Sequence, residues 1–312
     1  MLLKAYQELL NYQNVPKFLV KYLDCPSLLR LKNVGYFCGM DYASNDIYNF
    51  KEYISRYDHS LNVSLITYMV TSEERQTIAG LFHDISTPCF SHVIDYMNKD
   101  YEIQESTEKY TEQIIRSDKY LVSCLEKDNI KVEDIVNFKN YSIVDNDRPK
   151  LCADRLDGVI LPGLFWTKDL TIEQVKTIIQ NIIIYKNEFG EEEIGFNNYT
   201  TGRKIIEVSN NIDLYCHSNE DNYMMELLSD ITRLSIKNKY FTYEDLYKYN
   251  EDELFKIISE NRYNKELDIL VDRFESIKKD EIEKIDHPKI KMRILRPIVN
   301  KKRIGGDINE GL

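Results

Sequence analysis

The sequence predicts a mainly α-helical protein with small β additions. Apolar residues recur at helical spacing along much of the chain, for example at Leu61, Leu65 and Met69. Only 11 glycines and 7 prolines interrupt the 312 residues, so long loops are expected to be few. Hydrophobic residues make up 43% of the chain and charged residues 30%, a balance that supports a globular core.

Helical patterning begins at the N-terminus and continues through both halves of the chain. Residues 1–13 are interpreted as an amphipathic helix rather than a signal peptide, because the segment carries a glutamate. Further helical segments are expected near residues 61–69, 78–82, 105–127, 148–161, 171–186, 203–216 and 221–238. Thr171 with Gln174 predicts a capping box, and Thr242 with Asp245 is a weaker signal for a helix start.

Two segments break the helical pattern. Residues 187–198 contain glycines at 190 and 195 and predict a short hairpin or loop. Residues 288–296 alternate with the period of a strand, with Ile290, Met292 and Ile294 on one face and Lys289, Lys291 and Arg293 on the other. We interpret the basic stretch 289–303 as a solvated strand face that offsets the acidic bulk, in preference to a binding role, and a contact with single-stranded nucleic acid is the least expected of its uses.

The composition argues against several classes of partner. A net charge of −11 disfavours a broad electrostatic attraction for nucleic acid, which depends on neutralising phosphates. No apolar run approaches the roughly 20 residues that a membrane-spanning helix needs, so no membrane partner is expected. The six cysteines are scattered without a CxxC pair, which favours reduced thiols in a cytoplasmic protein.

Histidines and aspartates form the pattern that carries chemistry. His59, the dipeptide His83-Asp84 and Asp154 offer imidazole and carboxylate groups, which suit a divalent transition metal or magnesium. The alternative for each histidine is a hydrogen-bonded core residue without a ligand. The dipeptide follows an apolar helical run, where a charge is costly unless it is paired or bound to a metal. The joint pattern therefore favours a metal site built from several helices.

Three motifs contain these residues: RYDHSLNV at residues 56–63, LFHD continuing to FSHVID at residues 81–95, and ADRLD at residues 153–157. Together they resemble the motifs of the HD-domain metal-dependent phosphohydrolases, in the branch of the deoxynucleoside triphosphate triphosphohydrolases. Residues 214–228 and 250–260 resemble the C-terminal helices of that branch. The resemblance implies an HD-domain helical bundle as the catalytic core at residues 1–165. A helical C-terminal region with short β elements, residues 166–312, would pack on that core.

The resemblance also implies roles for individual residues. The metal ligands would be His59, His83, Asp84 and Asp154, and the divalent ion would be Mn, Fe, Ni, Zn or Mg. Arg56 would contact phosphate, and His92 with Asp95 would form the catalytic pair. Asp157 would assist the site or the substrate, although a helix salt bridge with Arg155 or Lys150 is the favoured alternative. Homo-oligomers are expected, and the basic C-terminal stretch could serve subunit contacts or a regulatory nucleotide site.

Departures from the branch concern the substrate. Thr87 stands where a second histidine is usual, and Thr107-Glu108 replaces a His-Glu pair. The candidate substrate contacts are Arg56, Thr87, Glu108 and Asp157. Gly158 and Pro162 stand where a tyrosine and an aspartate usually meet the sugar. The prediction is a metal-dependent phosphohydrolase acting on a nucleotide or nucleotide-like phosphate ester, with dNTP triphosphohydrolase activity in question. The alternatives are a phosphomonoesterase or cyclic-nucleotide phosphodiesterase, and a non-catalytic metal-bearing nucleotide sensor.

Overall fold

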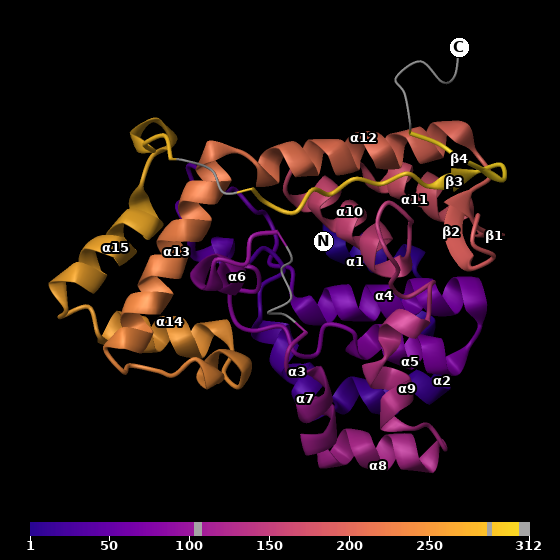
Figure 1. Cartoon of the computed structure of the whole chain (residues 1–312), viewed down its shortest axis with the longest axis horizontal. Coiled ribbons are helices and arrows are strands. Elements are labelled where there is room, and N and C mark those ends of the chain that lie inside the picture. The colour runs from indigo at the N-terminus through magenta and orange to yellow at the C-terminus, as the bar shows by residue number, and fades with distance from the viewer. Residues whose placement is uncertain (103–107, 286–288, 306–312) are drawn as a thin grey trace.

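The structure is a computed structural model that describes residues 1–102, 108–285 and 289–305. In it the chain folds mainly into helices (Figure 1). The N-terminal helices are α1 Leu2–Leu9, α2 Lys17–Val20, α3 Pro26–Arg30, α4 Arg56–Thr71, α5 Glu74–Phe82, α6 Val93–Asn98, α7 Thr111–Ser117, α8 Lys119–Lys127, α9 Val132–Val136 and α10 Ala153–Phe165. They are followed by α11 Ile172–Gln180, α12 Tyr199–Cys216, α13 Asn219–Lys237, α14 Glu251–Glu260 and α15 Lys265–Ser276. The strands are β1 Ile182–Lys186, β2 Glu192–Phe196, β3 Ile298–Val299 and β4 Lys302–Arg303. The predicted fold class, mainly α with small β additions, is confirmed.

Helix α4 lies at the centre of the N-terminal half. A capping box fixes its start, with the Asp58 amide donating to the Ser55 hydroxyl at 3.1 Å and the Ser55 amide donating to Asp58 at 2.9 Å. Most of its residues are buried on all sides, which is typical of a helix that runs through a core. It packs against α5 on one side and against α10 on another. These three helices carry the metal-ligand candidates.

The C-terminal half packs directly on this core. Helix α13 lies against α6 and α15, and α12 lies against α10 (Figure 1). Leu161 of α10, Val208 of α12 and Leu228 of α13 belong to the same hydrophobic cluster as Leu61 of α4. Residues of both predicted regions therefore share one core.

A small sheet closes the C-terminal half. Strands β1 and β2 form an antiparallel hairpin, β3 adds parallel to β2, and β4 pairs antiparallel with β3. Gly195 pairs with Ile298, and a Cβ atom at Gly195 would lie only 2.3 Å from the Ile298 carbonyl oxygen. Glycine is therefore required where the end of the chain returns to the hairpin.

Helix limits differ from the sequence prediction where β-branched residues and prolines intervene. The segment expected at 171–186 is helical only to Gln180, because Ile182–Lys186 forms β1 instead. The Thr171–Gln174 capping box at its start is confirmed. The helix expected at 148–161 begins only at Ala153, and the one expected at 105–127 is divided at Asp118, which caps α8. Residues 105–107 lie outside the described residues.

The strand expected at 288–296 is wrong for the described residues 289–296. Residues 289–297, here called the C-terminal strap, are extended but pair with no strand, and Pro288 lies outside the described residues. The strap bonds outward to loops and to α12: the amides of Lys291, Arg293 and Arg296 donate to Tyr101 O, Asp213 Oδ1 and Pro149 O at 3.0, 2.7 and 2.8 Å. Its apolar members Met292 and Ile294 are exposed, whereas Lys291 and Arg293 line a cavity. The interpretation of a solvated basic face is therefore also wrong for these two residues.

Within the described residues, every helix is too short or too polar to cross a bilayer. All six cysteines are free thiols, as expected from their scattered positions.

Candidate metal centre

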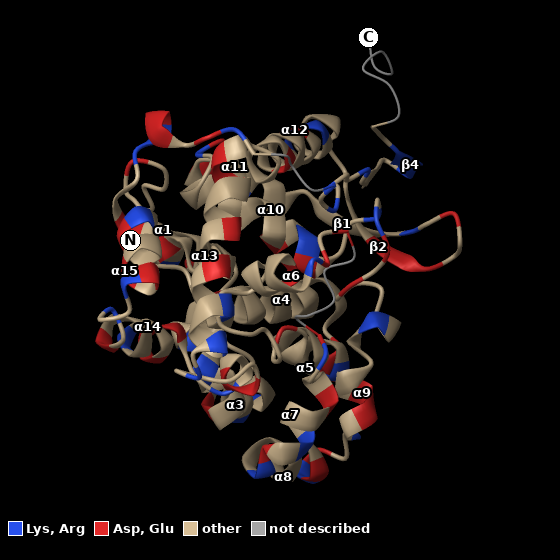
Figure 2. Ribbon diagram, turned by 60° about the vertical axis from the view of Figure 1, so that its left-hand side comes forward, with Lys and Arg blue, Asp and Glu red and all other residues tan. Residues whose placement is uncertain are grey.

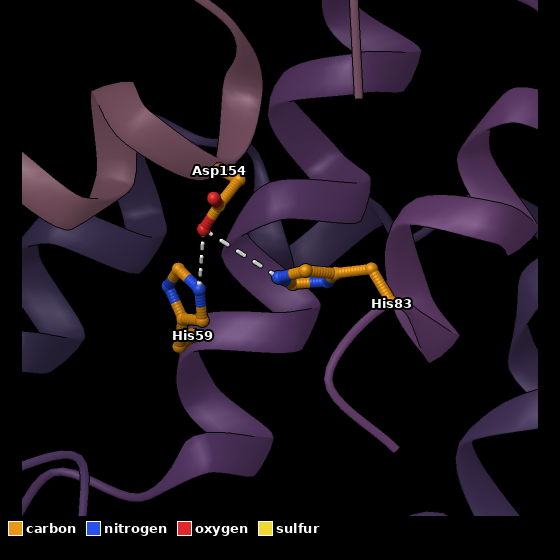
Figure 3. A group of neighbouring side chains, drawn as sticks. All are labelled: His59, His83 and Asp154. Atoms are coloured by element: carbon orange, nitrogen blue, oxygen red, sulfur yellow. Dashed lines mark hydrogen bonds and ion pairs between the residues drawn. The ribbon is translucent and has the colours of Figure 1, made fainter. Parts of the chain in front are cut away.

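Three helices bring one potential metal ligand each to a single point. His59 lies in the first turns of α4, His83 follows the last residue of α5, and Asp154 is the second residue of α10. Figure 3 shows both imidazole rings directed at the same carboxylate of Asp154. The local sequence sets this up, because Ser55 starts α4 just before His59 and the extended Cys152 starts α10 just before Asp154.

The spacing of the three ligand atoms fits a single metal ion. His59 Nε2 lies 3.1 Å and His83 Nε2 3.5 Å from Asp154 Oδ1, and one ligand atom from each residue falls within 4.8 Å of the others. Ligand atoms bonded to one ion at about 2.1 Å lie about 3.0 to 3.4 Å apart in octahedral or tetrahedral arrangements. The observed distances are close to these edges.

Asp84 completes the predicted set from a slightly greater distance. Its carboxylate oxygens lie 3.8 Å from His59 Nε2 and 3.7 Å from His83 Nε2. The same carboxylate accepts a hydrogen bond from Arg56 Nη1 at 3.0 Å. The four residues predicted as metal ligands are therefore neighbours in the fold.

His83 provides the clearest sign that the cluster needs a cation. Its Nδ1 lies 2.7 Å from the Gly80 carbonyl oxygen, which can only accept, so Nδ1 carries the proton. The opposite nitrogen, Nε2, is buried and has no hydrogen-bond partner among the described residues. A buried imidazole nitrogen that faces two carboxylates and has no hydrogen-bond partner suits a ligand of a divalent metal ion.

The electrostatics of the cluster point the same way. Burial alone would lower the pKa of His59, but hydrogen bonds to Asp154 and Asp157 raise it to about 10. Burial would raise the pKa of Asp154, yet the two histidines hold it well below its ordinary range. The Asp154 carboxylate is thus ionised, and the site favours positive charge at its centre.

Asp157 lies behind His59 instead of facing a substrate. Its carboxylate is fully buried, 2.7 Å from His59 Nδ1, and also accepts a hydrogen bond from the Tyr6 hydroxyl at 2.5 Å. The expected helix salt bridge is absent: Arg155 pairs with Asp145 at 3.0 Å and Lys150 pairs with Glu191 at 3.0 Å. Asp157 instead fixes the His59 ring so that Nε2 faces the cluster.

A second group of potential ligands shares Asp154. Asp145, Cys152 and Asp154 also have ligand atoms within 4.8 Å of one another. However, Arg155 already donates to Asp145, and burial raises the pKa of Cys152 to about 12, so its thiol is neutral near pH 7. A neutral thiol beside a guanidinium is a poor metal ligand, so His59, His83 and Asp154 form the better site.

The metal cluster opens into a cavity of about 620 Å³ that is also lined by His92, one member of the predicted catalytic pair. His92 lies on the cavity wall, and its Nδ1 is 2.9 Å from Oδ2 of the fully buried Asp95. Burial lowers the pKa of His92, and the charges of Arg56 and Arg293 oppose its protonation further. His92 and Asp95, the pair that the resemblance implies, are thus in hydrogen-bond contact, and their catalytic role stays a prediction.

The turn before His92 is strained and firmly held. Phe90 and Ser91 both adopt left-handed backbone angles, with φ of 65° and 46°, which non-glycine residues rarely do. The Phe90 amide donates to the buried Glu251 carboxylate at 2.9 Å, and the Ser91 hydroxyl accepts from Arg56 Nε at 3.2 Å. This turn aligns His92 with Arg56 beside the metal cluster.

Other candidate substrate contacts divide between the cavity and the core. Glu108 lines the cavity, where it pairs with Lys139 at 2.6 Å. Thr87 is fully buried away from the cavity wall, so a substrate contact by its side chain is not supported. Thr107 lies outside the described residues.

Several residues that line the cavity lie outside the sequence motifs and were not predicted as site residues. Tyr36 packs under the Arg56 guanidinium at 4.8 Å and beside the His59 ring, with 5.1 Å between ring centroids. Its hydroxyl also covers Gly158, where a Cβ atom would lie 3.7 Å from it. Arg148, Lys291 and Arg293 line the same cavity. The alternating basic residues of the strap were a signal for the last two, but their direction was not readable from sequence.

Comparison with known proteins identifies the domain that carries this centre. Residues 56–159 match the HD domain family, a range that includes the four predicted metal ligands and the His92–Asp95 pair. The chain is 24% identical over 273 residues to the uncharacterized protein YdhJ of Bacillus subtilis, covering 86% of this chain and 80% of that protein. It is also 24% identical over 129 residues to the metal-dependent phosphohydrolase cns2 of Cordyceps militaris. That match covers 41% of this chain and only 36% of the relative.

Proposed function

We propose that this HD-domain protein is a divalent-metal-dependent phosphohydrolase that acts on a nucleotide or a nucleotide-like phosphate ester. The observation that carries the proposal is the convergence of His59, His83 and Asp154 on the cavity that also holds the His92–Asp95 pair. The match to the HD domain family and the phosphohydrolase relative support the reaction class.

Each residue of the centre has a definite chemical task in this proposal. His59, His83, Asp154 and Asp84 would hold the metal ion, which when bound polarises a phosphoryl oxygen and increases the acidity of water. Arg56 presents a planar guanidinium beside the cluster and can hold a phosphate oxygen through charge-assisted hydrogen bonds. Its stacking on Tyr36 and its bonds to Asp84 and Ser91 fix its direction.

His92 would supply the proton for the leaving oxygen. Its Nδ1 is held by Asp95, which leaves Nε2 as the nitrogen that can donate. Burial keeps the pKa of His92 below its ordinary value, and an anionic phosphate in the cavity opposes that effect by favouring the imidazolium form. Substrate binding therefore prepares the group that protonates the leaving oxygen.

The cavity wall favours a substrate other than a deoxynucleoside triphosphate held by its sugar. Gly158 and Pro162 both line the cavity at the two places where a tyrosine and an aspartate were expected in sugar-binding relatives. Neither side chain can hydrogen-bond a hydroxyl group. This observation keeps a phosphomonoesterase or a cyclic-nucleotide phosphodiesterase as the second candidate.

Metal analysis tests the assignment of the centre. We expect purified wild-type protein to retain a divalent ion and the double variant His83→Ala/Asp84→Ala to lose it. His217→Ala is a matched control, because His217 bonds to the Asp213 carbonyl on α12 and does not line the cavity. Equal metal content in the wild type and the double variant would overturn the assignment.

Product analysis separates the candidate reactions. The protein would be screened with nucleotides and small phosphate esters while Mn, Mg, Ni, Fe and Zn are supplied separately. Tripolyphosphate as product indicates a triphosphohydrolase, whereas orthophosphate or a linear monophosphate indicates the second candidate. If every phosphate survives while nucleotide still raises the unfolding temperature, the protein is a sensor and the proposal of hydrolysis fails.

A further inference from the structure

The cavity has a second cationic wall, away from the motifs of the HD domain. Lys291 and Arg293 of the C-terminal strap and Arg148 of the loop before α10 all line it. The strap is anchored there by its backbone, because the Arg293 amide donates to Asp213 at 2.7 Å and its carbonyl oxygen accepts from the Ser209 hydroxyl at 2.9 Å. Arg148 is joined to the strap by a hydrogen bond of 2.9 Å from Nη1 to the Met292 carbonyl oxygen.

Arg293 is the least satisfied charge on this wall. Its Nε is buried without a hydrogen-bond partner, and no ion pair involves its guanidinium in the part of the chain that the structure describes. The neighbouring Cys216 thiol is neutral near pH 7, because burial raises its pKa to about 11. Asp221 is near enough for the charge of Arg293 to affect its pKa. Its hydrogen bond, however, is with the Tyr48 hydroxyl, which donates to Asp221 at 2.6 Å, and not with Arg293. A buried guanidinium that forms no ion pair is costly, so the arrangement fits a site that an external anion completes.

The three cations also repel one another. Burial lowers the pKa of Arg148 to about 10, and the charges of Arg293 and Arg155 contribute to that decrease. Burial likewise lowers the pKa of Lys291, with Arg148 and Arg293 adding to the effect. Like charges collected on one wall destabilise the unliganded protein, which an anion between them would reverse.

Other cations of the cavity are matched by acids of the protein. Arg56 pairs with Asp84, Lys139 with Glu108, Lys150 with Glu191 and Arg155 with Asp145. Among the described residues, Arg148 and Arg293 are the cavity arginines for which no such ion pair is formed. Both of these arginines therefore belong to the wall formed with the strap.

We propose that Arg148, Lys291 and Arg293 form a second anion site, which binds a further phosphate group of the substrate apart from the phosphate at the metal centre. This inference rests on the proposed phosphohydrolase function and narrows it to substrates with two anionic groups. The second phosphate is either the next one in a polyphosphate chain or a separate phosphate on the sugar. Arg293 and His92 line the same cavity, and the charge of Arg293 contributes to the lowered pKa of His92, so one bound molecule can reach both the metal centre and this wall.

A binding measurement tests the site without requiring turnover. Inorganic pyrophosphate is titrated into the manganese-loaded full chain and the unfolding temperature is followed. We expect pyrophosphate to stabilise the wild type and its affinity to fall about 10- to 100-fold in Arg293→Gln, as for the loss of charge-assisted hydrogen bonds. Arg296→Gln is the matched control, because Arg296 is an exposed arginine of the same strap outside the cavity. Equal losses in both variants, or none in Arg293→Gln, would overturn the proposal.

The unliganded proteins give a second, independent readout. Removing an unpaired buried charge should leave the unfolding temperature of Arg293→Gln equal to or above that of the wild type. A marked decrease would show that Arg293 serves to hold the strap, and the anion site would be rejected for this residue. If Arg293→Gln does not fold, Arg148→Gln decides the matter in the same pyrophosphate titration, since it approaches the site from a different segment.

Turnover then distinguishes the two sources of the second phosphate. One nucleoside is compared as its 5′-monophosphate, 5′-diphosphate and 3′,5′-bisphosphate. We expect the kcat/KM ratio of the preferred two-phosphate compound to the monophosphate to fall at least about 10-fold in Arg293→Gln. A uniform loss for all three compounds would contradict a second site. If no compound is hydrolysed while pyrophosphate binding still depends on Arg293, the proposed function fails and the anion site stands.

Discussion

Single residues of the centre are held by partners whose supporting role the motifs did not indicate. His59 is oriented by Asp157, which is in turn bonded to Tyr6 in the first helix of the chain. His83 is oriented by a backbone carbonyl, so that only its Nε2 remains to bind a ligand. The ligand set was readable from the sequence, whereas these supporting contacts required the fold.

The support of His59 leads to a prediction about metal affinity. Asp157→Asn keeps the size of the side chain but removes the charge that orients the ring, so metal affinity should fall about 10- to 100-fold. Tyr6→Phe removes only the hydrogen bond behind Asp157 and should have a smaller effect in the same direction. Isothermal titration with Mn²⁺ measures both, and unchanged affinity in Asp157→Asn would contradict the role assigned to it.

His92 leads to a prediction about catalysis. His92→Ala removes the proton donor but none of the metal ligands, so turnover should fall about 10²- to 10⁴-fold with the metal content unchanged. Parallel assays of phosphate release and bound metal check this. Loss of metal together with activity would place His92 in the metal cluster instead.

At the scale of elements, helix starts determine where the ligands lie. Ser55 caps α4 immediately before Arg56 and His59, and α10 starts at Ala153 immediately before Asp154. The sequence predicted that residues 148–152, just before Asp154, would also be helical. Instead, residues 148–152 are not helical, and Arg148 can reach the strap.

The cap of α4 should connect stability with the metal site. Ser55→Ala removes one half of the capping box and should cost about 1 kcal/mol of unfolding free energy. Because the first turns of α4 carry Arg56 and His59, metal affinity should also decrease. Thr171→Ala, at the capping box of α11, is the control: urea unfolding should show a similar cost, with metal affinity unchanged. Equal effects of both variants on metal binding would contradict this link.

At the scale of the whole molecule, the net negative charge of the protein contrasts with the positive charge gathered in the cavity. Acidic and basic residues are spread over most helices and strands of the chain (Figure 2). The net charge of −11 disfavours the binding of anions to the protein surface as a whole. Phosphate recognition is therefore expected only inside the cavity, where the metal centre and the second cationic wall supply positive charge.

A buried pair of acids joins distant parts of the chain and predicts a pH dependence. Glu251 at the start of α14 and Asp41 each have a buried oxygen without a hydrogen-bond partner among the described residues, and both lie 2.9 Å from where a Cβ of Gly35 would be. Burial raises the pKa of Glu251 from 4.5 to about 8 and that of Asp41 to about 7. The folded protein thus binds protons that the unfolded chain releases, so stability should fall as pH rises from about 5 to 8.

Glu251→Gln tests this dependence. The amide keeps the acceptor for the Phe90 amide but cannot ionise, so the decrease in unfolding free energy between pH 5 and pH 8 should become smaller. Glu260→Gln, an exposed substitution on the same helix, should leave the decrease unchanged. Urea unfolding at several pH values measures it, and identical slopes for the wild type and Glu251→Gln would contradict the prediction.

The sequence by itself determined the fold class and indicated the candidate metal ligands. Helical periodicity depends on local spacing, and the candidates His59, His83, Asp84 and Asp154 lie in contiguous motifs, so both could be proposed without coordinates. Contact of these ligands across three helices then followed from packing α4 between α5 and α10.

Only the tertiary structure decided which residues face the cavity. The strap alternates basic and apolar residues whichever face is buried, and its anchoring on α12 turns Arg293 inward while leaving Met292 exposed. Asp157 and Thr87 were equally open to substrate in the sequence, but packing places both in the core. The physical reason is that alternation fixes which side chains share a face, whereas long-range contacts fix the direction of that face.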